Sequence, residues 1–323
     1  MKQYKLALFD MDGVMTKENC YWKAAAMTVW EMIYQERPTE MLRRTEEIYN
    51  TVFCRSEVIH AAKEAGVNTN YDMAYVVTAL AYSFRNTEEP FLHVLAFFRE
   101  QERLVPLLYQ QCGEAAGGGS WYYGGEKWEQ IRKLFQDWYL GDGAERPGFV
   151  HREQPLFPPE QLKAFLTRLQ KAGVAAGIGT GRFRNEIVPH LKRWGISDLF
   201  DPERIVTQTE VFQAQEEAKK NGMDLSLSKP HFYIFGKGVA GLSEDDMAVL
   251  HRSFDPTLLN QTLVVGDAGA DLYSARSLGA DFAAVLTGVA GSAERPFFEA
   301  EQATYIADDI FGLLPILEGG KGE

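Results

Sequence analysis

Two aspartates separated by one residue follow the first apolar stretch of the chain. Residues 6–12 read Leu-Ala-Leu-Phe-Asp-Met-Asp, and Gly13 follows at once. Two carboxylates this close repel each other, and each raises the pKa of the other unless a positive charge lies nearby. We therefore expect the chain to supply a compensating cation, either a basic side chain or a bound metal ion.

Further polar residues follow other apolar stretches. Thr180 and Gly181 come after residues 174–178, and Asp267 and Asp271 come after residues 261–265. Lys229, followed by a proline, precedes the second of these stretches. In an open parallel sheet, sites form beyond the carboxyl ends of the strands, so we expect these side chains to meet there.

The residue types favour phosphoryl chemistry with Mg²⁺. Asp10, Asp12 and Asp267 offer hard oxygen ligands, which suit Mg²⁺. With Asp271 the site has four carboxylates, and Mg²⁺ together with Lys229 would compensate three of their charges. Protonation of one carboxylate would remove the remaining negative charge, and a general acid must carry such a proton. One aspartate can attack phosphorus while the other protonates the leaving oxygen.

A phosphate-binding turn is predicted at Thr180 and Gly181. The Thr180 hydroxyl and the Gly181 N–H are neutral donors that precede a helix expected over residues 184–193. Donors at the start of a helix favour anions. Arg182 and Arg184 are candidates for clamping a substrate, although arginines that open a helix are more often solvated.

The elements that must position these residues alternate between strand and helix. Strands are expected at 4–9, 174–178, 204–207, 261–265, 281–286 and 304–306. Helices between them, such as 159–172, predict an α/β fold with a doubly wound, Rossmann-like parallel sheet.

A helical domain interrupts this pattern after the first strand. Apolar residues at three and four spacing predict helices at 21–37, 55–66, 71–85, 90–111 and 127–139, with a glycine-rich loop at 117–125. The predicted domains are an α/β core, residues 1–16 and 150–323, and an all-helical cap, residues 17–149.

Composition excludes several classes of protein. The chain has 323 residues, of which 46% are hydrophobic and 24% charged, and its net charge of -12 argues against binding to nucleic acid or to an acidic membrane surface. No apolar run approaches ~18 residues, so no membrane span is expected. Three scattered cysteines and the early first strand indicate a reduced, cytoplasmic protein without a signal peptide.

The motifs together resemble the haloacid dehalogenase superfamily, in the subgroup with a helical cap after the first motif. The segment Phe9-Asp10-Met11-Asp12-Gly13 is similar to the DxDG motif, and Ile178-Gly179-Thr180-Gly181 to the Ser/Thr motif. Lys229-Pro230 is similar to the lysine motif, and residues 266–271 to the GDxxxD motif. The four motifs occur in the family's order and cover the core.

The resemblance implies a role for each residue. Asp10 would be the nucleophile that forms an aspartyl-phosphate, and Asp12 the general acid and base. Asp10, Asp12 through its backbone carbonyl and Asp267 would hold Mg²⁺, with Asp271 in support. Thr180, Gly181 and Lys229 would bind the phosphoryl group.

The prediction is therefore a Mg²⁺-dependent phosphatase that acts on a small phosphorylated metabolite, with the helical cap closing over the site. Two alternatives stay open: a phosphosugar mutase of the same architecture, and a non-catalytic small-molecule-binding protein on this fold. The sequence does not indicate the substrate, the oligomeric state, or the roles of residues 117–125 and 236–257.

Overall fold

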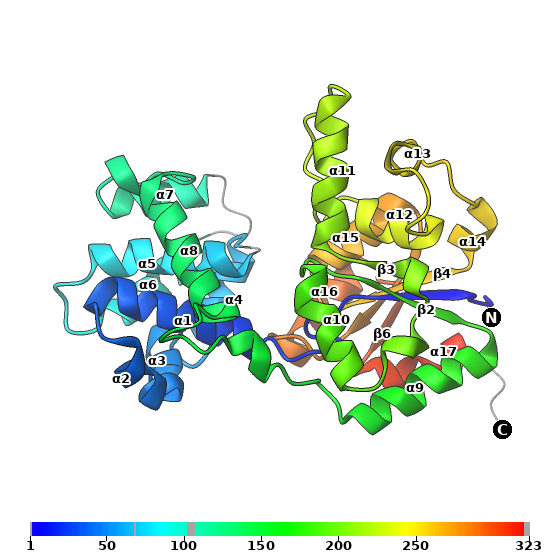
Figure 1. The fold of residues 1–323 in the computed structure, drawn as a ribbon, viewed down its shortest axis with the longest axis horizontal. Coiled ribbons are helices and arrows are strands. Elements are labelled where there is room, and N and C mark those ends of the chain that lie inside the picture. Colours follow the sequence, from blue (N-terminus) through cyan, green and yellow to red (C-terminus); the bar gives the residue numbers. More distant parts are fainter. Residues whose placement is uncertain (1, 68, 102–106, 320–323) are drawn as a thin grey trace. The chain divides into compact units, whose positions relative to one another are not determined.

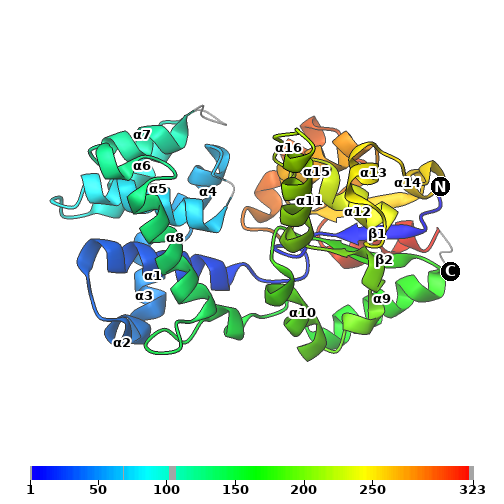
Figure 2. The same cartoon turned by 45° about the horizontal axis from the view of Figure 1, so that its top comes forward.

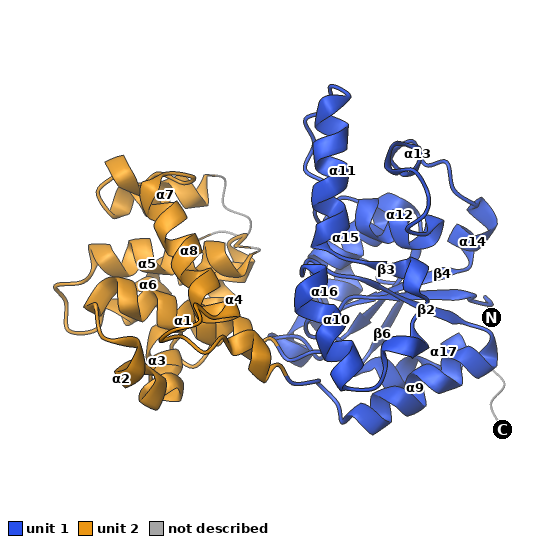
Figure 3. Ribbon diagram, viewed as in Figure 1, with its two compact units in different colours: residues 1–17, 154–323 blue, residues 18–153 orange. Residues whose placement is uncertain are grey.

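The chain forms two compact units. A computed structural model describes residues 2–67, 69–101 and 107–319. The core unit comprises residues 1–17 and 154–323, and the helical unit comprises residues 18–153 (Figure 3). Within the core unit, the Lys17 N–H donates to the Gln154 carbonyl over 3.1 Å, so the two segments that lead to the helical unit run side by side.

A six-stranded parallel sheet forms the centre of the core unit (Figure 1). Its order is β3-β2-β1-β4-β5-β6, which places the first strand of the chain in the middle. The predicted fold class, a doubly wound α/β sheet, is confirmed. The strands are β1 (Leu6–Phe9), β2 (Ala175–Gly179), β3 (Ile205–Val206), β4 (Thr262–Gly266), β5 (Asp281–Val285) and β6 (Tyr305–Ala307).

Both faces of the sheet are covered because successive residues of a strand point to opposite sides. Ala7 and Phe9 pack with α9 (Pro159–Ala172), α10 (Arg184–Arg193) and α17 (Leu314–Leu317). Leu6 and Leu8 pack with the helices of the other face. These are α11 (Gln208–Lys220), α12 (Tyr233–Ala240), α15 (Gly269–Leu278) and α16 (Arg295–Ala300).

The segment 236–257, whose role the sequence left open, contributes to this second face. Its first residues form the end of α12, which is buried against the sheet. A side chain at Gly238 would place its Cβ 3.0 Å from Leu8 Cδ1, so the glycine allows α12 to lie close to β1. Two short helices follow, α13 (Asp246–Leu250) and α14 (Pro256–Asn260).

The helical unit contains no strand among its described residues. Helices α1 and α5 pack against each other, and α8 packs on both of them. Most of α5 is buried, which explains why it is apolar on nearly every side. The helices are α1 (Asn19–Tyr34), α2 (Pro38–Met41), α3 (Thr45–Val52), α4 (Glu57–Glu64), α5 (Asn70–Ser83), α6 (Pro90–Arg99), α7 (Leu108–Ala115) and α8 (Glu126–Leu140), shown in Figure 2.

Three sequence predictions for this unit differ from the structure. The single helix expected over 90–111 ends at Arg99 as α6, and α7 begins at Leu108, after a left-handed backbone at Leu107 (φ 61°); residues 102–106 of the predicted helix lie outside the described part of the chain. Helix α3 was not predicted. The glycine-rich loop is not wholly exposed: Trp121 is buried, and its carbonyl accepts a hydrogen bond from the Tyr75 hydroxyl over 2.5 Å.

The boundary between the units also differs by a few residues. The sequence placed 150–153 in the core, whereas they belong to the helical unit together with the short 3₁₀ helix Phe149–Arg152. The ring of Phe149 packs against that of Trp138 in α8, with centroids 6.0 Å apart. None of the helices in the described part of the chain is long and apolar enough to cross a membrane.

Candidate active site

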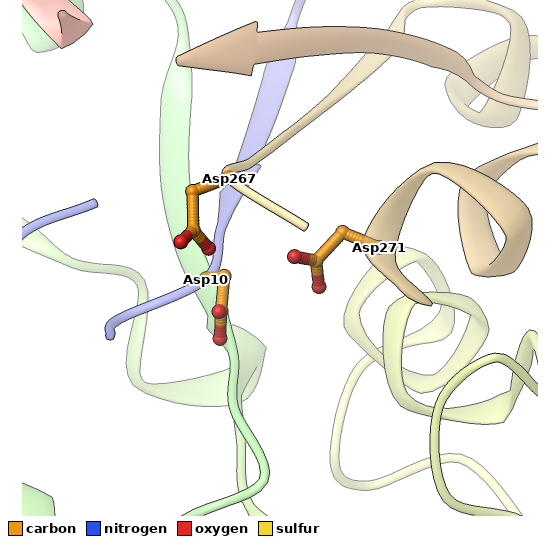
Figure 4. A group of neighbouring side chains, drawn as sticks. All are labelled: Asp10, Asp267 and Asp271. Carbon is orange, nitrogen blue, oxygen red and sulfur yellow. The ribbon is translucent and has the colours of Figure 1, made fainter. Parts of the chain in front are cut away.

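Three carboxylates meet at the carboxyl ends of the two central strands. Asp10 follows β1 and Asp267 follows β4, which are hydrogen-bonded neighbours. Asp271 lies in the first turn of α15. One oxygen from each carboxylate lies within 4.8 Å of the others, and Figure 4 shows the three side chains gathered at this point. Strand order reverses between β1 and β4, so this is the place where a sheet of this type binds its ligand.

Lys229 compensates two of these carboxylates. Its Nζ lies 2.9 Å from Asp10 Oδ1 and 2.6 Å from Asp271 Oδ1. The ammonium group also lies over the ring of Phe235, 4.9 Å from the centroid. Phe235 can approach because residue 179 is glycine, where a Cβ would lie 2.6 Å from the ring. The basic side chain that the paired aspartates required is therefore present at the site.

Burial and charge act against each other in the pKa values of this group. Burial raises the pKa of Asp10 to about 7, opposed by Lys229 and aided by the charges of Asp271 and Asp12. Burial alone would lower the pKa of Lys229, but the carboxylates of Asp10 and Asp271 outweigh it and raise that pKa above its ordinary value. Lys229 is thus a stable ammonium ion, and Asp10 needs further positive charge to be fully ionised at neutral pH.

The side chain of Asp12 is held by a different cation. Arg182 donates through Nε to Asp12 Oδ2 over 2.9 Å and through its second guanidinium nitrogen to Oδ1. The Thr16 hydroxyl donates to Oδ1 over 2.9 Å. Among the described residues, the three-carboxylate group does not include the Asp12 carboxylate. Asp12 therefore lies beside the cluster, with its orientation set by two donors.

Arg182 is the functional residue that sequence reasoning did not place. It was considered a substrate clamp or a solvated residue, yet it is 2% exposed and forms a two-point ion pair with Asp12. Burial of a guanidinium requires such a partner. The excess negative charge predicted for the site was the available clue, because it called for a second basic residue.

Thr180 and Gly181 lie in the turn after β2. The Thr180 N–H donates to the Val206 carbonyl over 3.1 Å, and the Thr180 hydroxyl accepts from the Arg182 N–H over 3.3 Å. Gly181 is exposed, and a Cβ there would have no atom within 4 Å, so the turn leaves open space. Arg184, the other arginine considered, pairs with Glu210 on α11 over 2.8 Å.

The charge of the six residues fits a divalent cation. Four aspartates face two basic residues, Lys229 and Arg182, so two negative charges are uncompensated within this set. All of the donors toward the centre are carboxylate oxygens. Hard oxygen ligands with this charge suit Mg²⁺, which favours a few carboxylates together with water and phosphate.

Comparison with known proteins agrees with the fold and with part of the site. Residues 227–313, which include Lys229, Asp267 and Asp271, match the family model described as HAD-hydrolase-like. No curated protein matches the chain. Over these residues, the family match agrees with the resemblance to haloacid dehalogenase-like hydrolases that the motifs indicate.

Solved structures extend the similarity over the whole chain. The X-ray structure of a structural genomics target has 23% identity and a TM-score of 0.73, and the alignment covers 98% of this chain and 100% of that chain. This similarity establishes a shared fold. Two others have TM-scores of 0.45. YfnB from Bacillus subtilis, solved bound to magnesium, has 16% identity with 98% and 99% coverage. A predicted phosphoglycolate phosphatase from Haemophilus somnus has 16% identity with 99% and 100% coverage.

Proposed function

We propose that the protein is a Mg²⁺-dependent phosphatase that hydrolyses a small phosphorylated metabolite through an aspartyl-phosphate. The observation that carries this proposal is the meeting of Asp10, Asp267 and Asp271 within 4.8 Å, with Lys229 between two of them. Once a divalent cation compensates its carboxylates, such a centre would bind a phosphate monoester and present a carboxylate to its phosphorus. A reducing, cytoplasmic location is part of the proposal, because no disulfide joins Cys20, Cys54 and Cys112.

The metal would be held by Asp10 and Asp267, with the Asp12 carbonyl as a further ligand and Asp271 in support. Bound Mg²⁺ would neutralise phosphate oxygens and favour the ionised form of Asp10. Thr180, the Gly181 N–H and Lys229 would bind the remaining phosphoryl oxygens and stabilise the charge that they carry in the transition state.

Asp10 and Asp12 would divide the chemistry. An Asp10 oxygen forms a bond to phosphorus as the ester P–O bond breaks, and Asp12 gives the leaving oxygen a proton. Water then attacks the aspartyl-phosphate, Asp12 removes its proton, and inorganic phosphate leaves with Asp10 restored. The contacts of Asp12 with Arg182 and Thr16 would orient it for both proton transfers.

Acid-quenched single turnover with a ³²P-labelled phosphate monoester tests this proposal. We expect label on Asp10 by peptide mapping, release of inorganic phosphate, and loss of both after treatment with EDTA, with recovery when Mg²⁺ is added. Asp10→Asn should not be labelled. Asp12→Ala should still be labelled by a substrate with a good leaving group, such as nitrophenyl phosphate, and should release phosphate slowly.

Each step has a result that would contradict it. Label on another residue would refute Asp10 as the nucleophile, and full activity in metal-free protein would refute the metal. Transfer of label to a second sugar hydroxyl without release of phosphate would favour the phosphosugar mutase. Binding of phosphorylated compounds without turnover by any of them would favour the non-catalytic alternative.

A further inference from the structure

The carboxylate of Asp267 lies in a narrow space between two glycines. A Cβ at Gly13 would lie 2.3 Å from Asp267 Oδ2, and a Cβ at Gly288 would lie 1.9 Å from the same oxygen. Real Cβ atoms do not approach other atoms this closely. Any side chain at either position would therefore displace the carboxylate, so the absence of side chains on both sides leaves the space that this orientation of Asp267 needs.

The two glycines belong to loops that are far apart in the sequence. Gly13 follows β1, has a left-handed backbone (φ 69°) and is buried. Gly288 lies in the turn after β5. The Thr287 hydroxyl donates to the Gly13 carbonyl over 2.5 Å and so joins the two loops directly. Asp267, which follows β4 between them, is enclosed by the ends of three strands.

We propose that Gly288 and Thr287, together with Gly13, position the Asp267 carboxylate for Mg²⁺ before the ion binds, which rests on the proposed function. A ligand whose rotation is already restricted loses little conformational entropy when the metal arrives. Partners that orient a metal ligand typically contribute about 10- to 100-fold to affinity. Gly288 and Thr287 lie outside all four motifs of the sequence.

The restricted carboxylate also favours one ion over another. Mg²⁺ demands nearly ideal octahedral geometry, whereas Ca²⁺ accepts variable numbers and directions of oxygen ligands. Displacing the Asp267 carboxylate should therefore weaken Mg²⁺ binding more than Ca²⁺ binding. General damage to the fold would weaken both ions alike, so the ratio of the two affinities reports positioning alone.

Gly288→Ala is the direct test, because the backbone of Gly288, unlike that of Gly13, has no positive φ and the substitution acts through the Cβ contact alone. The apparent Kd for each ion is taken from the rise in Tm of the metal-free protein as MgCl₂ or CaCl₂ is added. We expect the Kd for Mg²⁺ to increase about 10- to 100-fold and that for Ca²⁺ to increase several-fold less.

Matched variants separate positioning from stability. Gly312→Ala introduces a methyl group at another core-unit glycine without positive φ, 3.2 Å from the Ala307 Cβ, and should leave both affinities unchanged. Thr287→Val removes the hydroxyl at constant shape and should shift Mg²⁺ binding in the same direction by a smaller factor. Thr287→Ser keeps the hydroxyl and should bind Mg²⁺ with the affinity of the wild type. If Gly288→Ala does not fold, the Thr287 pair decides.

The outcomes distinguish this inference from the proposed function. Wild-type affinity for Mg²⁺ in both Gly288→Ala and Thr287→Val, or equal losses for the two ions, would overturn the inference and leave the phosphatase proposal intact. A wild-type protein whose Tm does not respond to Mg²⁺ and that releases no phosphate would overturn both.

Discussion

The two units each bury a carboxylate, and they compensate it in different ways. In the core unit, Asp271 is 1% exposed and pairs with Lys229, which also holds Asp10. In the helical unit, Asp72 is 4% exposed and accepts hydrogen bonds from neutral groups. The Thr69 hydroxyl donates to it over 2.6 Å and the Trp128 indole N–H over 3.2 Å.

The origin of the partners explains the difference. Thr69 is the N-cap of α5, and its hydroxyl accepts the Asp72 N–H over 3.2 Å, so the pair caps a helix within four residues. Asp10, Asp271 and Lys229 come from three separate segments, and two like charges share one cation. Two carboxylates that share one ammonium group destabilise the folded chain unless a further positive charge binds near them. Burial of a carboxylate does not by itself indicate a functional site. Like charges brought together from separate elements are the stronger indication.

The largest effect is expected from removing the shared cation. Lys229→Met keeps the aliphatic stem and leaves Asp10 and Asp271 without their ammonium partner. We expect kcat for a phosphate monoester to fall about 10²- to 10³-fold, because the charge that stabilises the transition state is lost. Steady-state kinetics at saturating Mg²⁺, with unfolding followed in parallel, measures the effect.

Lys237 supplies the matched control. It is a second buried lysine of the core unit, paired with Asp246 over 2.7 Å. Lys237→Met should lower stability by about 1–2 kcal/mol, because the half-buried Asp246 carboxylate loses its cation and keeps only the Tyr233 hydroxyl as a donor, and should keep kcat within about twofold. Equal losses of activity in the two variants would mean that Lys229 acts only through stability.

The strands could be predicted from sequence because each β-strand is short, apolar and followed by a polar turn, whereas their order in the sheet comes from the structure. Asp10 and Asp267 could be predicted to meet because each follows a strand of one parallel sheet, and Lys229 was expected there as their cation. The helical unit was predicted less well. Its helix ends are the weakest part: α6 ends at Arg99 although the apolar spacing continues, and Leu107 has a left-handed backbone although it is not glycine.

The partner of Asp12 could not be derived from periodicity. Arg182 lies 170 residues away, and only the pairing of β1 with β2 brings the two together. The contact of Gly288 with Asp267 could not be predicted either, because Gly288 lies outside the motifs and only the fold brings it next to Asp267. Charge counting indicated that a cation was missing, and the fold determined which residue supplies it.

A smaller effect is expected at Arg182, where the cation holds one carboxylate that is already outside the cluster. Arg182→Gln keeps a donor but loses the two-point contact with Asp12. We expect the rate of aspartyl-phosphate formation to fall about 10- to 100-fold with alkyl phosphates and less with nitrophenyl phosphate, whose leaving group needs no proton. Single-turnover labelling with the two substrates measures this selectivity, apart from the hydrolysis step that both share.

Arg184, two residues further along the chain at the start of α10, provides the comparison. Its guanidinium pairs with Glu210 and is about one-third exposed, so Arg184→Gln should change kcat for both substrates by less than about twofold. An equal fall in the rate of aspartyl-phosphate formation with alkyl and nitrophenyl substrates in Arg182→Gln would contradict a role for Arg182 in orienting Asp12.

The smallest effect on activity is expected at Asp72, where the change should appear in stability instead. Asp72→Asn keeps the shape but leaves one donor, that of Thr69 or of Trp128, without its acceptor. We expect kcat to stay within about twofold and unfolding to require about 1–2 kcal/mol less free energy. Equilibrium unfolding in urea, followed by tryptophan fluorescence, measures the difference.

The pH dependence of that difference has a definite sign. Burial raises the pKa of Asp72 in the folded chain above its ordinary value near 3.8, which it keeps in the unfolded chain. At a pH between the unfolded and the folded pKa, the folded chain therefore binds the proton more tightly than the unfolded chain. The contribution of Asp72 to stability is therefore full below about pH 4 and is lost as the pH rises through the raised pKa, at no more than about 1.4 kcal/mol per pH unit. The difference in the free energy of unfolding between wild type and Asp72→Asn should shrink over that interval and stay constant above it.

Asp142 gives the opposite case, because the backbone N–H of Arg146, with other donors, lowers its pKa. The difference between wild type and Asp142→Asn should instead shrink as the pH falls below about 4. A difference for Asp72→Asn that grows with pH would show that the pKa of Asp72 is lowered in the folded chain, so that its hydrogen bonds outweigh the effect of burial.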